Sequence, residues 1–254
     1  MEIGAQLYTV REFTQTAADF TKTIKKVADM GYKYVQVSGI GPINAQNVAD
    51  ICSSHGISIA ITHTNPERII NDTDAVIKEH QVMSAKYIGI GMMPGDYQRN
   101  KEGVRGFISD FKNAANKIHA SGMTFMYHNH DFEFEKYDNK RMIEYLIDEC
   151  PHMGFTLDTY WVQAGGADPS AWVKALKGRV DVVHLKDMSY VNGSQVMAEV
   201  MEGNLNWDSI FYACTSADVK YAMVEQDDCY GADPFQCLKQ SLENIKNRYH
   251  EHSF

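Results

Sequence analysis

Short apolar segments alternate with longer amphipathic stretches along the whole chain. The apolar segments have the length and composition of β-strands, and eight of them can be drawn, at residues 3–8, 33–38, 57–62, 86–91, 123–128, 154–158, 180–184 and 221–225. In the stretches between them, apolar residues recur every three or four positions, as Phe20, Ile24, Val27 and Met30 do before the helix stop signal Gly31. This pattern predicts strands that alternate with helices.

Strands that are separated by helices pair in parallel, because each helix carries the chain back by a right-handed crossover. Eight such units predict a closed (β/α)8 TIM barrel of the α/β class, and the 254 residues of the chain match the roughly 250 that this fold needs. We expect a single domain over residues 1–254. An open doubly wound sheet is the alternative, but it would require a glycine-rich turn after the first strand, where the chain reads YTVREF.

Composition and charge indicate a soluble protein, because 44% of the residues are hydrophobic and 22% are charged. The net charge of -9 argues against nucleic acid or an anionic membrane as a partner, since phosphate contacts need clustered Lys and Arg. No apolar run approaches the roughly 20 residues of a membrane span, and the first residues do not resemble a signal peptide. The five cysteines form no CxxC pair, so we predict free thiols in a reducing compartment. We therefore expect a soluble cytoplasmic enzyme.

Each of the last four predicted strands ends in a side chain that can bind a metal ion. These residues are His128, Asp158, His184 and Glu225. The carboxyl ends of barrel strands share one rim, where catalytic residues gather, so we expect the four side chains to meet. Two imidazoles and two carboxylates suit Mn, Co, Fe or Zn and leave one or two positions for substrate oxygens. Each residue alone has a simpler explanation, such as a hydrogen-bonded histidine or a helix cap, but together they favour a metal centre.

Further polar residues share a face with these ligands, because side chains two positions apart on a strand point the same way. His130, Lys186 and Asp227 each follow a ligand in this way. Lys186 is a candidate acid or base, an oxyanion stabiliser, or an ion-pair partner of Asp187, and as a base it would need a lowered pKa. His63, after the third strand, is either a substrate contact or a hydrogen-bonded polar residue.

Two long segments, residues 130–141 and 187–207, follow strands on the same rim and are candidate covers for a substrate. Glu133 and Glu135 in the first segment either reach the site or face solvent. Trp161 either stacks on the apolar face of a sugar or packs in the core. For the remaining histidines a surface, hydrogen-bonding or helix-capping role suffices; they are His55, His80, His119, His152, His250 and His252.

Six motifs are similar to those of one known family. They are IGAQLYTVRE, GYKYVQVSG, YHNHDFEF, LDTYWVQAGGADP, VVHLKDM and VEQDD, and they extend over essentially the whole chain. Together they resemble the xylose-isomerase-like TIM barrels called sugar phosphate isomerases/epimerases, whose relatives include D-tagatose 3-epimerase, inosose dehydratase and endonuclease IV. The resemblance implies a divalent metal, expected to be Mn, Co, Zn or Mg with Mn favoured. Its ligands would be His128, Asp158, His184 and Glu225.

Three positions depart from the pattern of this family. The best-known epimerases have a glutamate that is both ligand and acid/base where this chain has His128, and a histidine where it has Trp161. Related chains often carry glutamate at the end of the second strand, where Gln36 stands. A mechanism with two glutamates is therefore in doubt, and His130 or Lys186 would take one proton-transfer role. The missing histidine ligands disfavour the endonuclease activity, and EGNLNW is the nearest stretch to an anion-binding loop.

The leading hypothesis for the function is a metal-dependent sugar isomerase or epimerase. The metal would polarise a carbonyl group, a base would remove the neighbouring proton, and an enediolate would form. Glu225 and His130 are the candidate proton-transfer groups, with Lys186 stabilising the oxyanion. The candidate substrate contacts are His63, Trp161, Gln36 and Asp227.

Two alternatives stay open. The first is a lyase that expels a leaving group from the enediolate, as in inosose dehydration or the cleavage of a 3-keto-glycoside, including a C-glycoside. The loss of one glutamate at His128 favours it mildly, because elimination needs no matched base on the opposite face. The second is a non-catalytic barrel subunit with a vestigial site. The expected partner is a small sugar or keto-sugar, and a homo-oligomer or a partner subunit that completes the pocket is left open.

Overall fold

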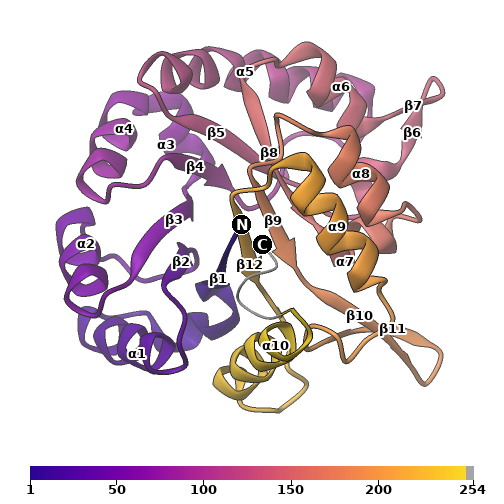
Figure 1. Ribbon diagram of the computed structural model, residues 1–254. Helices are drawn as coiled ribbons and strands as arrows, with labels where there is room; N and C mark the ends of the chain where they lie inside the picture. The colour runs from indigo at the N-terminus through magenta and orange to yellow at the C-terminus, as the bar shows by residue number, and fades with distance from the viewer. Residues whose placement is uncertain (250–254) are drawn as a thin grey trace.

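Eight parallel strands form a closed barrel in the computed structural model, which describes residues 1–249 (Figure 1). Around the barrel their order is β1-β12-β9-β8-β5-β4-β3-β2. Their bounds are Glu2–Gln6 for β1, Tyr34–Val37 for β2, Ser58–His63 for β3, Tyr87–Ile90 for β4, Thr124–His128 for β5, Met153–Asp158 for β8, Val182–Leu185 for β9 and Tyr221–Val224 for β12. The predicted TIM barrel is confirmed, and the doubly wound sheet is wrong.

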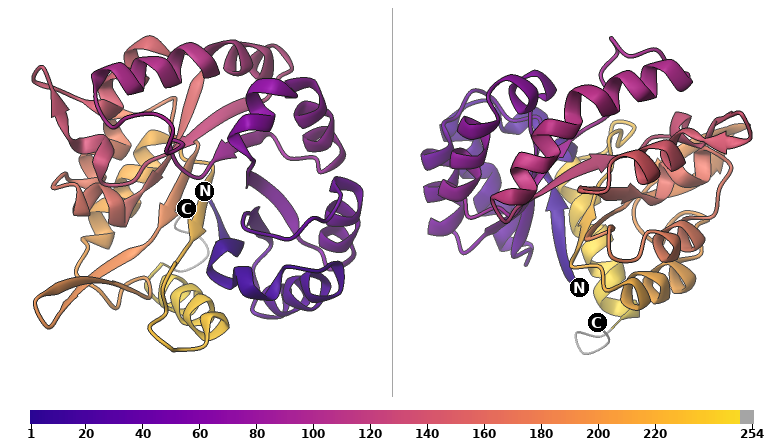
Figure 2. Two further views of the ribbon diagram at one scale, coloured as in Figure 1. Left: turned by 180° about the vertical axis from the view of Figure 1, so that it is seen from behind. Right: turned by 90° about the horizontal axis from the view of Figure 1, so that it is seen from above.

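Helices form the outer ring of the molecule (Figure 2). They are α1 (Ala17–Asp29), α2 (Ala45–Ser54), α3 (Pro66–Asn71), α4 (Thr73–Val82), α5 (Lys101–Ala120), α6 (Met142–Glu149), α7 (Thr159–Ala164), α8 (Pro169–Ala175), α9 (Trp207–Ala217) and α10 (Pro234–Arg248). Thr16, Asn44 and Asn100 cap three of them by accepting a hydrogen bond from the third helical amide. None of the helices in residues 1–249 is long and apolar enough to cross a membrane, and all five cysteines are free.

The first strand is shorter than the apolar pattern predicts. The chain leaves the barrel after Gln6 and forms a 3-10 helix, η1 (Leu7–Phe13). The side chain of Gln6 caps this helix, since its Oε1 accepts a hydrogen bond of 3.2 Å from the amide of Tyr8. Leu7 and Val10 are buried, so their apolar character reflects packing of η1 and not a longer strand.

Packing inside the barrel explains why polar groups gather at one end. A small apolar cluster fills the barrel interior and includes Met126, Val182 and Met223. These three residues lie two positions before His128, His184 and Glu225, on the same strand face. The polar side chains therefore form the next layer toward the carboxyl ends of the strands, where barrel enzymes place their chemistry.

The two long rim segments each contain a hairpin. Residues 130–141 hold the 3-10 turn η2 (Phe132–Phe134) and the short strands β6 (Lys136–Tyr137) and β7 (Lys140–Arg141). Residues 187–207 hold β10 (Asp187–Val191) and β11 (Ser194–Ala198), which pair antiparallel. Both hairpins project outward from the barrel (Figure 1).

Candidate metal centre

The four predicted ligands meet at the carboxyl end of the barrel. His128 and Asp158 end β5 and β8, His184 lies within β9, and Glu225 directly follows β12. One ligand atom of each side chain lies within 4.8 Å of the others, and all four side chains are buried. Asp158 and His184 are register partners on neighbouring strands. The expected convergence of these residues is therefore confirmed.

The distances between the donor atoms fit one divalent cation. Asp158 Oδ2 lies 3.3 Å from His128 Nε2 and 3.6 Å from His184 Nδ1. His184 Nδ1 lies 2.8 Å from Glu225 Oε2, and neither atom has a partner in hydrogen-bond geometry. Two atoms that bind the same ion at about 2.1 Å lie roughly 3 to 4 Å apart. The contact between His128 and Asp158 also has hydrogen-bond geometry, and the four donor atoms lie close enough together to bind one ion.

Both histidines are held in the tautomer that a metal requires. Nδ1 of His128 lies 2.7 Å from the carbonyl oxygen of Gly91, and Nε2 of His184 lies 2.8 Å from Oε1 of Gln36. Both oxygens only accept hydrogen bonds, so each of these ring nitrogens carries the proton. The opposite nitrogens face the other ligands, so in the neutral form of each ring the lone pair points toward the centre. Such outer contacts are typical of metal-binding histidines, and they give Gln36 a positioning contact with His184.

Asp158 combines a structural role with a place in the centre. Its Oδ1 caps α7 by accepting a hydrogen bond of 3.1 Å from the amide of Trp161. Its Oδ2 remains on the side of the two histidines. The helix-cap explanation of this aspartate is therefore correct, and it does not compete with metal binding because the two oxygens serve different neighbours.

Lys186 is buried among carboxylates beside the four ligands. Its Nζ lies 3.2 Å from Asp158, 3.0 Å from Glu225 and 2.8 Å from Asp227. Three nearby acidic side chains thus share one ammonium group. The alternative in which Lys186 pairs with Asp187 is wrong, because adjacent residues of an extended segment point to opposite faces.

Asp187 instead organises the loop that follows the β10–β11 hairpin. Its carboxylate accepts hydrogen bonds from the amides of Met201, Gly203 and Leu205 at 2.8, 3.0 and 3.3 Å. The indole of Trp207 donates to the same carboxylate at 2.6 Å. The segment EGNLNW therefore wraps around an acid of this chain, and its amides at Gly203 and Leu205 are not free to hold a phosphate.

The charges around this centre keep Asp158 and Glu225 ionised. Burial opposes the charged forms of Asp158 and Glu225, but the neighbouring Lys186 and histidines outweigh it and hold both pKa values below their ordinary range. Burial likewise opposes the ammonium of Lys186, yet its three carboxylates raise the pKa. Lys186 is thus charged, which suits an oxyanion stabiliser and not a base.

His184 makes the stability of the metal-free protein sensitive to pH. Burial lowers the pKa of its imidazole, but Glu225 and Asp158 outweigh burial and raise it to about 9 from 6.5. Because the pKa of His184 is higher in the folded state, its protonation stabilises the folded protein. This stabilisation is complete below the unfolded-state pKa of 6.5 and is lost as the pH rises from 6.5 through 9. The full loss is on the order of 3 kcal/mol.

We expect urea unfolding in the presence of a chelator to show falling stability between about pH 7 and about pH 8.5. The Mn-loaded protein should not show this loss, because metal binding requires the lone pair of His184 Nδ1 and has already released its proton. Equal slopes with and without metal would contradict the assignment of His184 as a ligand.

His130 lies over the centre as a neutral imidazole. Its ring centroid is 4.9 Å from that of His128 and 5.0 Å from that of Trp161. Burial lowers the pKa of His130 to about 3. Its Nδ1 is buried without a hydrogen-bond partner. A ring nitrogen is therefore available for contact with a bound molecule.

His63 extends the site toward the first half of the barrel. Its ring lies 5.4 Å from that of His128 and 5.9 Å from that of His184. Its Nδ1 is 3.0 Å from Ser38 Oγ, while Nε2 is buried without a partner. Together with other rim residues it borders a cavity of about 300 Å³, lined by Tyr8, Ser38, His63, Gly91, Met92, His128, His130, Lys186, Glu225 and Asp227.

Comparison with known proteins identifies the family. Residues 24–248 match the xylose isomerase-like TIM barrel family. The chain belongs to this family. Among curated protein sequences, none matches the chain significantly.

Several solved structures share this xylose isomerase-like fold. A sugar phosphate isomerase/epimerase from Parabacteroides distasonis ATCC 8503 has a TM-score of 0.78 and 23% identity, and the match covers 96% of this chain and 97% of that one. A D-allulose 3-epimerase from Methylomonas sp. has a TM-score of 0.70 and 17% identity, covering 98% of both chains. A probable 3-DHS dehydratase from Bacillus anthracis has a TM-score of 0.72 and 16% identity, covering 98% and 100%. At these identities the likeness shows the fold alone.

Besides Gly91 and Met92, which follow β4, two residues of this cavity are not among the sequence candidates. Tyr8 and Ser38 line the cavity, and they follow β1 and β2 as closely as the recognised residues follow later strands. The same strand-end rule would have found Ser38. Tyr8 was hidden because the first strand was drawn two residues too long.

Glu133 is the other residue whose place the sequence left open. It is fully buried, accepting a hydrogen bond of 2.6 Å from the hydroxyl of Tyr127 and one of 2.8 Å from the amide of His130. Burial raises its pKa to about 7. Glu133 thus ties the rim segment to β5 and holds the backbone at His130, while Glu135 is exposed.

Replacing Glu133 with alanine should cost about 2 to 4 kcal/mol, because it leaves two buried donors without an acceptor. The loss of the contact with the His130 amide should also raise the KM for substrate. The exposed Glu135→Ala, in the same segment, is the matched control and should change stability by less than about 0.5 kcal/mol. Urea unfolding and steady-state kinetics measure both effects, and equal stability of the two variants would contradict the role given to Glu133.

The remaining histidines outside the centre have local roles where the structure describes them. His80 is buried between Thr62 Oγ1 and the carbonyl of Val76, each at 2.7 Å. His55 is the C-cap residue of α2, and the exposed rings of His119 and His152 stack at 4.2 Å. His250 and His252 lie outside residues 1–249.

Proposed function

We propose that this protein is a divalent-metal-dependent sugar isomerase or epimerase that acts through an enediolate. The observation that carries the proposal is the buried His/Asp/His/Glu group at the carboxyl end of the barrel, with both imidazoles oriented by Gly91 and Gln36 so that the opposite nitrogen faces the other ligands. Imidazole and carboxylate donors suit Mn, Co or Zn, with Mg less matched, and we favour Mn. When bound, the metal would supply Lewis acidity to a substrate carbonyl and its neighbouring hydroxyl.

The chain offers separate groups for holding the ion, moving a proton and stabilising charge. His128, Asp158, His184 and Glu225 would hold the ion. The ammonium of Lys186 sits within 3.2 Å of Asp158, where it would stabilise negative charge on a substrate oxygen.

Glu225 and His130 are the proposed proton-transfer pair. Both border the cavity, and the neutral ring of His130 has a nitrogen without a partner. His63 and Asp227 border the same cavity and are the proposed substrate contacts there. Trp161 lies against His130, and Gln36 lies against His184. These two residues would therefore act on the substrate through the positions of the two histidines.

A lyase reaction on a keto-sugar is the second candidate. The imidazole at His128 favours it, because Glu225 is then the one glutamate among the four ligands. Elimination needs no matched base on the opposite face of the substrate. The charged Lys186 and the neutral His130 could then assist a departing oxygen. Dehydration of an inosose and cleavage of a 3-keto-glycoside both start with the same proton abstraction.

Deuterium uptake from solvent tests the shared step. The Mn-loaded protein is incubated in heavy water with keto-sugars, inososes and 3-keto-glycosides, and mass spectrometry follows the substrate and its products. Deuterium uptake without loss of any other atoms supports an isomerase or epimerase, whereas loss of water or release of a second product supports a lyase. Exchange at full rate after metal removal would overturn the proposal, and metal binding without any exchange would point to a non-catalytic subunit.

A further inference from the structure

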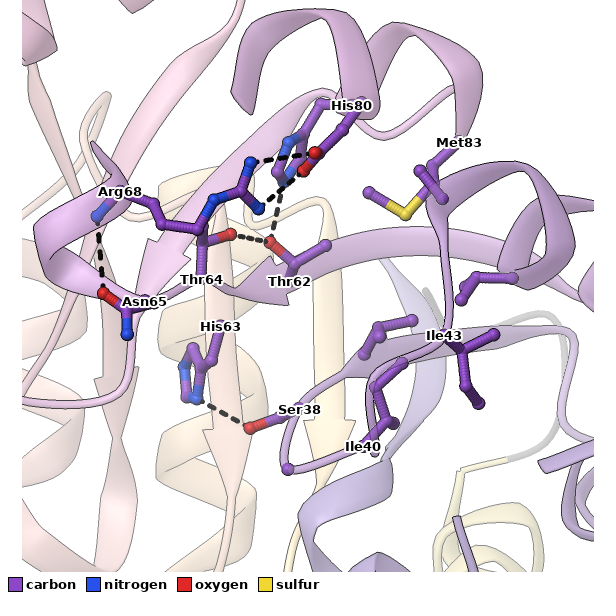
Figure 3. A pocket seen from close by; sticks show the side chains of 15 residues that line it. Ser38, Ile40, Ile43, Thr62, His63, Thr64, Asn65, Arg68, His80 and Met83 are labelled. Atoms are coloured by element: carbon purple, nitrogen blue, oxygen red, sulfur yellow. Dashed lines mark hydrogen bonds and ion pairs between the residues drawn. The ribbon is translucent and has the colours of Figure 1, made fainter. Parts of the chain in front are cut away.

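A second cavity lies beside the candidate metal centre, between the segments that follow β2 and β3 (Figure 3). Its volume is about 220 Å³. One wall is apolar and includes Ile40, Ile43 and Met83, and the opposite wall carries Asn65 and Arg68. The two isoleucines and the methionine are only partly buried, although they pack against the core. This wall is therefore open to contact with a further apolar group.

The second cavity adjoins the cavity of the metal centre. Ser38 and His63 line both, and their side chains are joined by the contact of 3.0 Å between Oγ and Nδ1 (Figure 3). A molecule whose polar end lies at the metal centre therefore has a second hollow directly beyond these two side chains. Each cavity alone is at or below the smallest volumes usual for ligand pockets, about 300 Å³, while the pair falls within the usual range.

The charged groups of the second cavity and most of its polar side chains are already paired within the chain, while Nε2 of His63 has no hydrogen-bond partner. Arg68 donates to both carboxylate oxygens of Glu79 at 2.9 and 2.8 Å, so its charge is neutralised by a bidentate partner. Asn65 Oδ1 caps α3. His80 is held by Thr62 and a backbone carbonyl. No unpaired cation of the residues lining this cavity is left to attract a phosphate.

We propose that the second cavity is a subsite for an uncharged apolar substituent of the substrate. The substrate would then be a non-phosphorylated sugar derivative, with its polyhydroxyl part at the metal centre and its apolar part against Ile40, Ile43 and Met83. A dry cavity of about 150 Å³ holds a benzene ring, so the volume suits an aromatic group. This inference rests on the proposed function for the assignment of the polyhydroxyl part.

Binding of simple glycosides tests the subsite without turnover. Calorimetry on the Mn-loaded protein compares phenyl β-D-glucopyranoside with methyl β-D-glucopyranoside. We expect the phenyl glycoside to bind about tenfold more tightly, since even one methylene in an apolar pocket changes affinity by about tenfold or more. Ile43→Trp fills the cavity and should remove this preference while leaving the affinity for the methyl glycoside unchanged.

Two further variants make the result decisive. Ile40→Trp fills the same wall and serves if Ile43→Trp does not fold, and Ile147→Trp changes a partly buried isoleucine of α6 as the matched control. Equal affinities for the two glycosides, or a phenyl preference that survives both filling variants, overturn the subsite. If glucose 6-phosphate binds more tightly than glucose and Ile43→Trp removes this difference, the subsite binds a charged group and the proposal of an uncharged substituent is overturned. If the preference for the phenyl glycoside is retained but no substrate exchanges deuterium with solvent, the proposed function is contradicted and the subsite is not.

Discussion

Replacing Asp158 with asparagine is expected to remove both metal binding and turnover. The amide keeps an oxygen that can cap α7, as Oδ1 does now toward the amide of Trp161, so the fold should be retained. The variant loses the negative charge that faces His128 and His184. Loss of an outer contact to a metal ligand already costs about 10- to 100-fold in affinity, so the loss of a ligand should exceed 100-fold.

Asp168→Asn is the matched control for this experiment. Asp168 is also an aspartate at the N-cap of a helix, accepting from the amides of Ser170 and Ala171, but it lies outside the centre. It should leave the metal content and kcat/KM unchanged. Metal analysis after dialysis, together with the deuterium-exchange rate, measures both variants. If Asp158→Asn retained a full metal complement and full exchange, the centre would not be the site of reaction.

The position of the four ligands could be predicted because it follows from backbone geometry alone. Parallel strands place their carboxyl ends on one rim, and alternation of side chains places Met126 below His128 and Met223 below Glu225 in the same barrel interior. No detail of side-chain packing is needed to bring these groups together. The same alternation, applied to Lys186 and Asp187, would have shown that they face opposite ways.

Contacts between segments distant in sequence could not be predicted in this way. The acceptors that orient the two histidine rings are the carbonyl of Gly91, which follows β4, and the side chain of Gln36 in β2. The second cavity depends on how two connecting segments pack, and its neutral character depends on the pairing of Arg68 with Glu79. No periodicity of the sequence encodes these contacts, because loop conformation is set by local turns and tertiary packing.

Replacing Lys186 with methionine should separate metal binding from turnover. The ammonium is the shared partner of Asp158, Glu225 and Asp227, and methionine keeps much of its apolar volume while removing the charge. A divalent cation next to the ligands is repelled by this ammonium, so its removal should leave Mn affinity equal or higher. If Lys186 stabilises an oxyanion, the exchange rate should fall by about 10²- to 10³-fold. This pattern is opposite in sign to that of Asp158→Asn for metal binding.

The stability of Lys186→Met should also depend on the metal. Without metal, three acidic side chains lose their common partner, and breaking a buried pair costs about 3 to 5 kcal/mol. With Mn bound, the charge of the ion replaces the ammonium for Asp158 and Glu225, so the loss should shrink. Lys239→Met, which removes an exposed lysine of α10 paired with Glu243, should change stability by less than about 0.5 kcal/mol in either state. Urea unfolding with chelator and with Mn measures both variants. A Lys186→Met protein as stable as the parent without metal would show that the carboxylates do not depend on this ammonium.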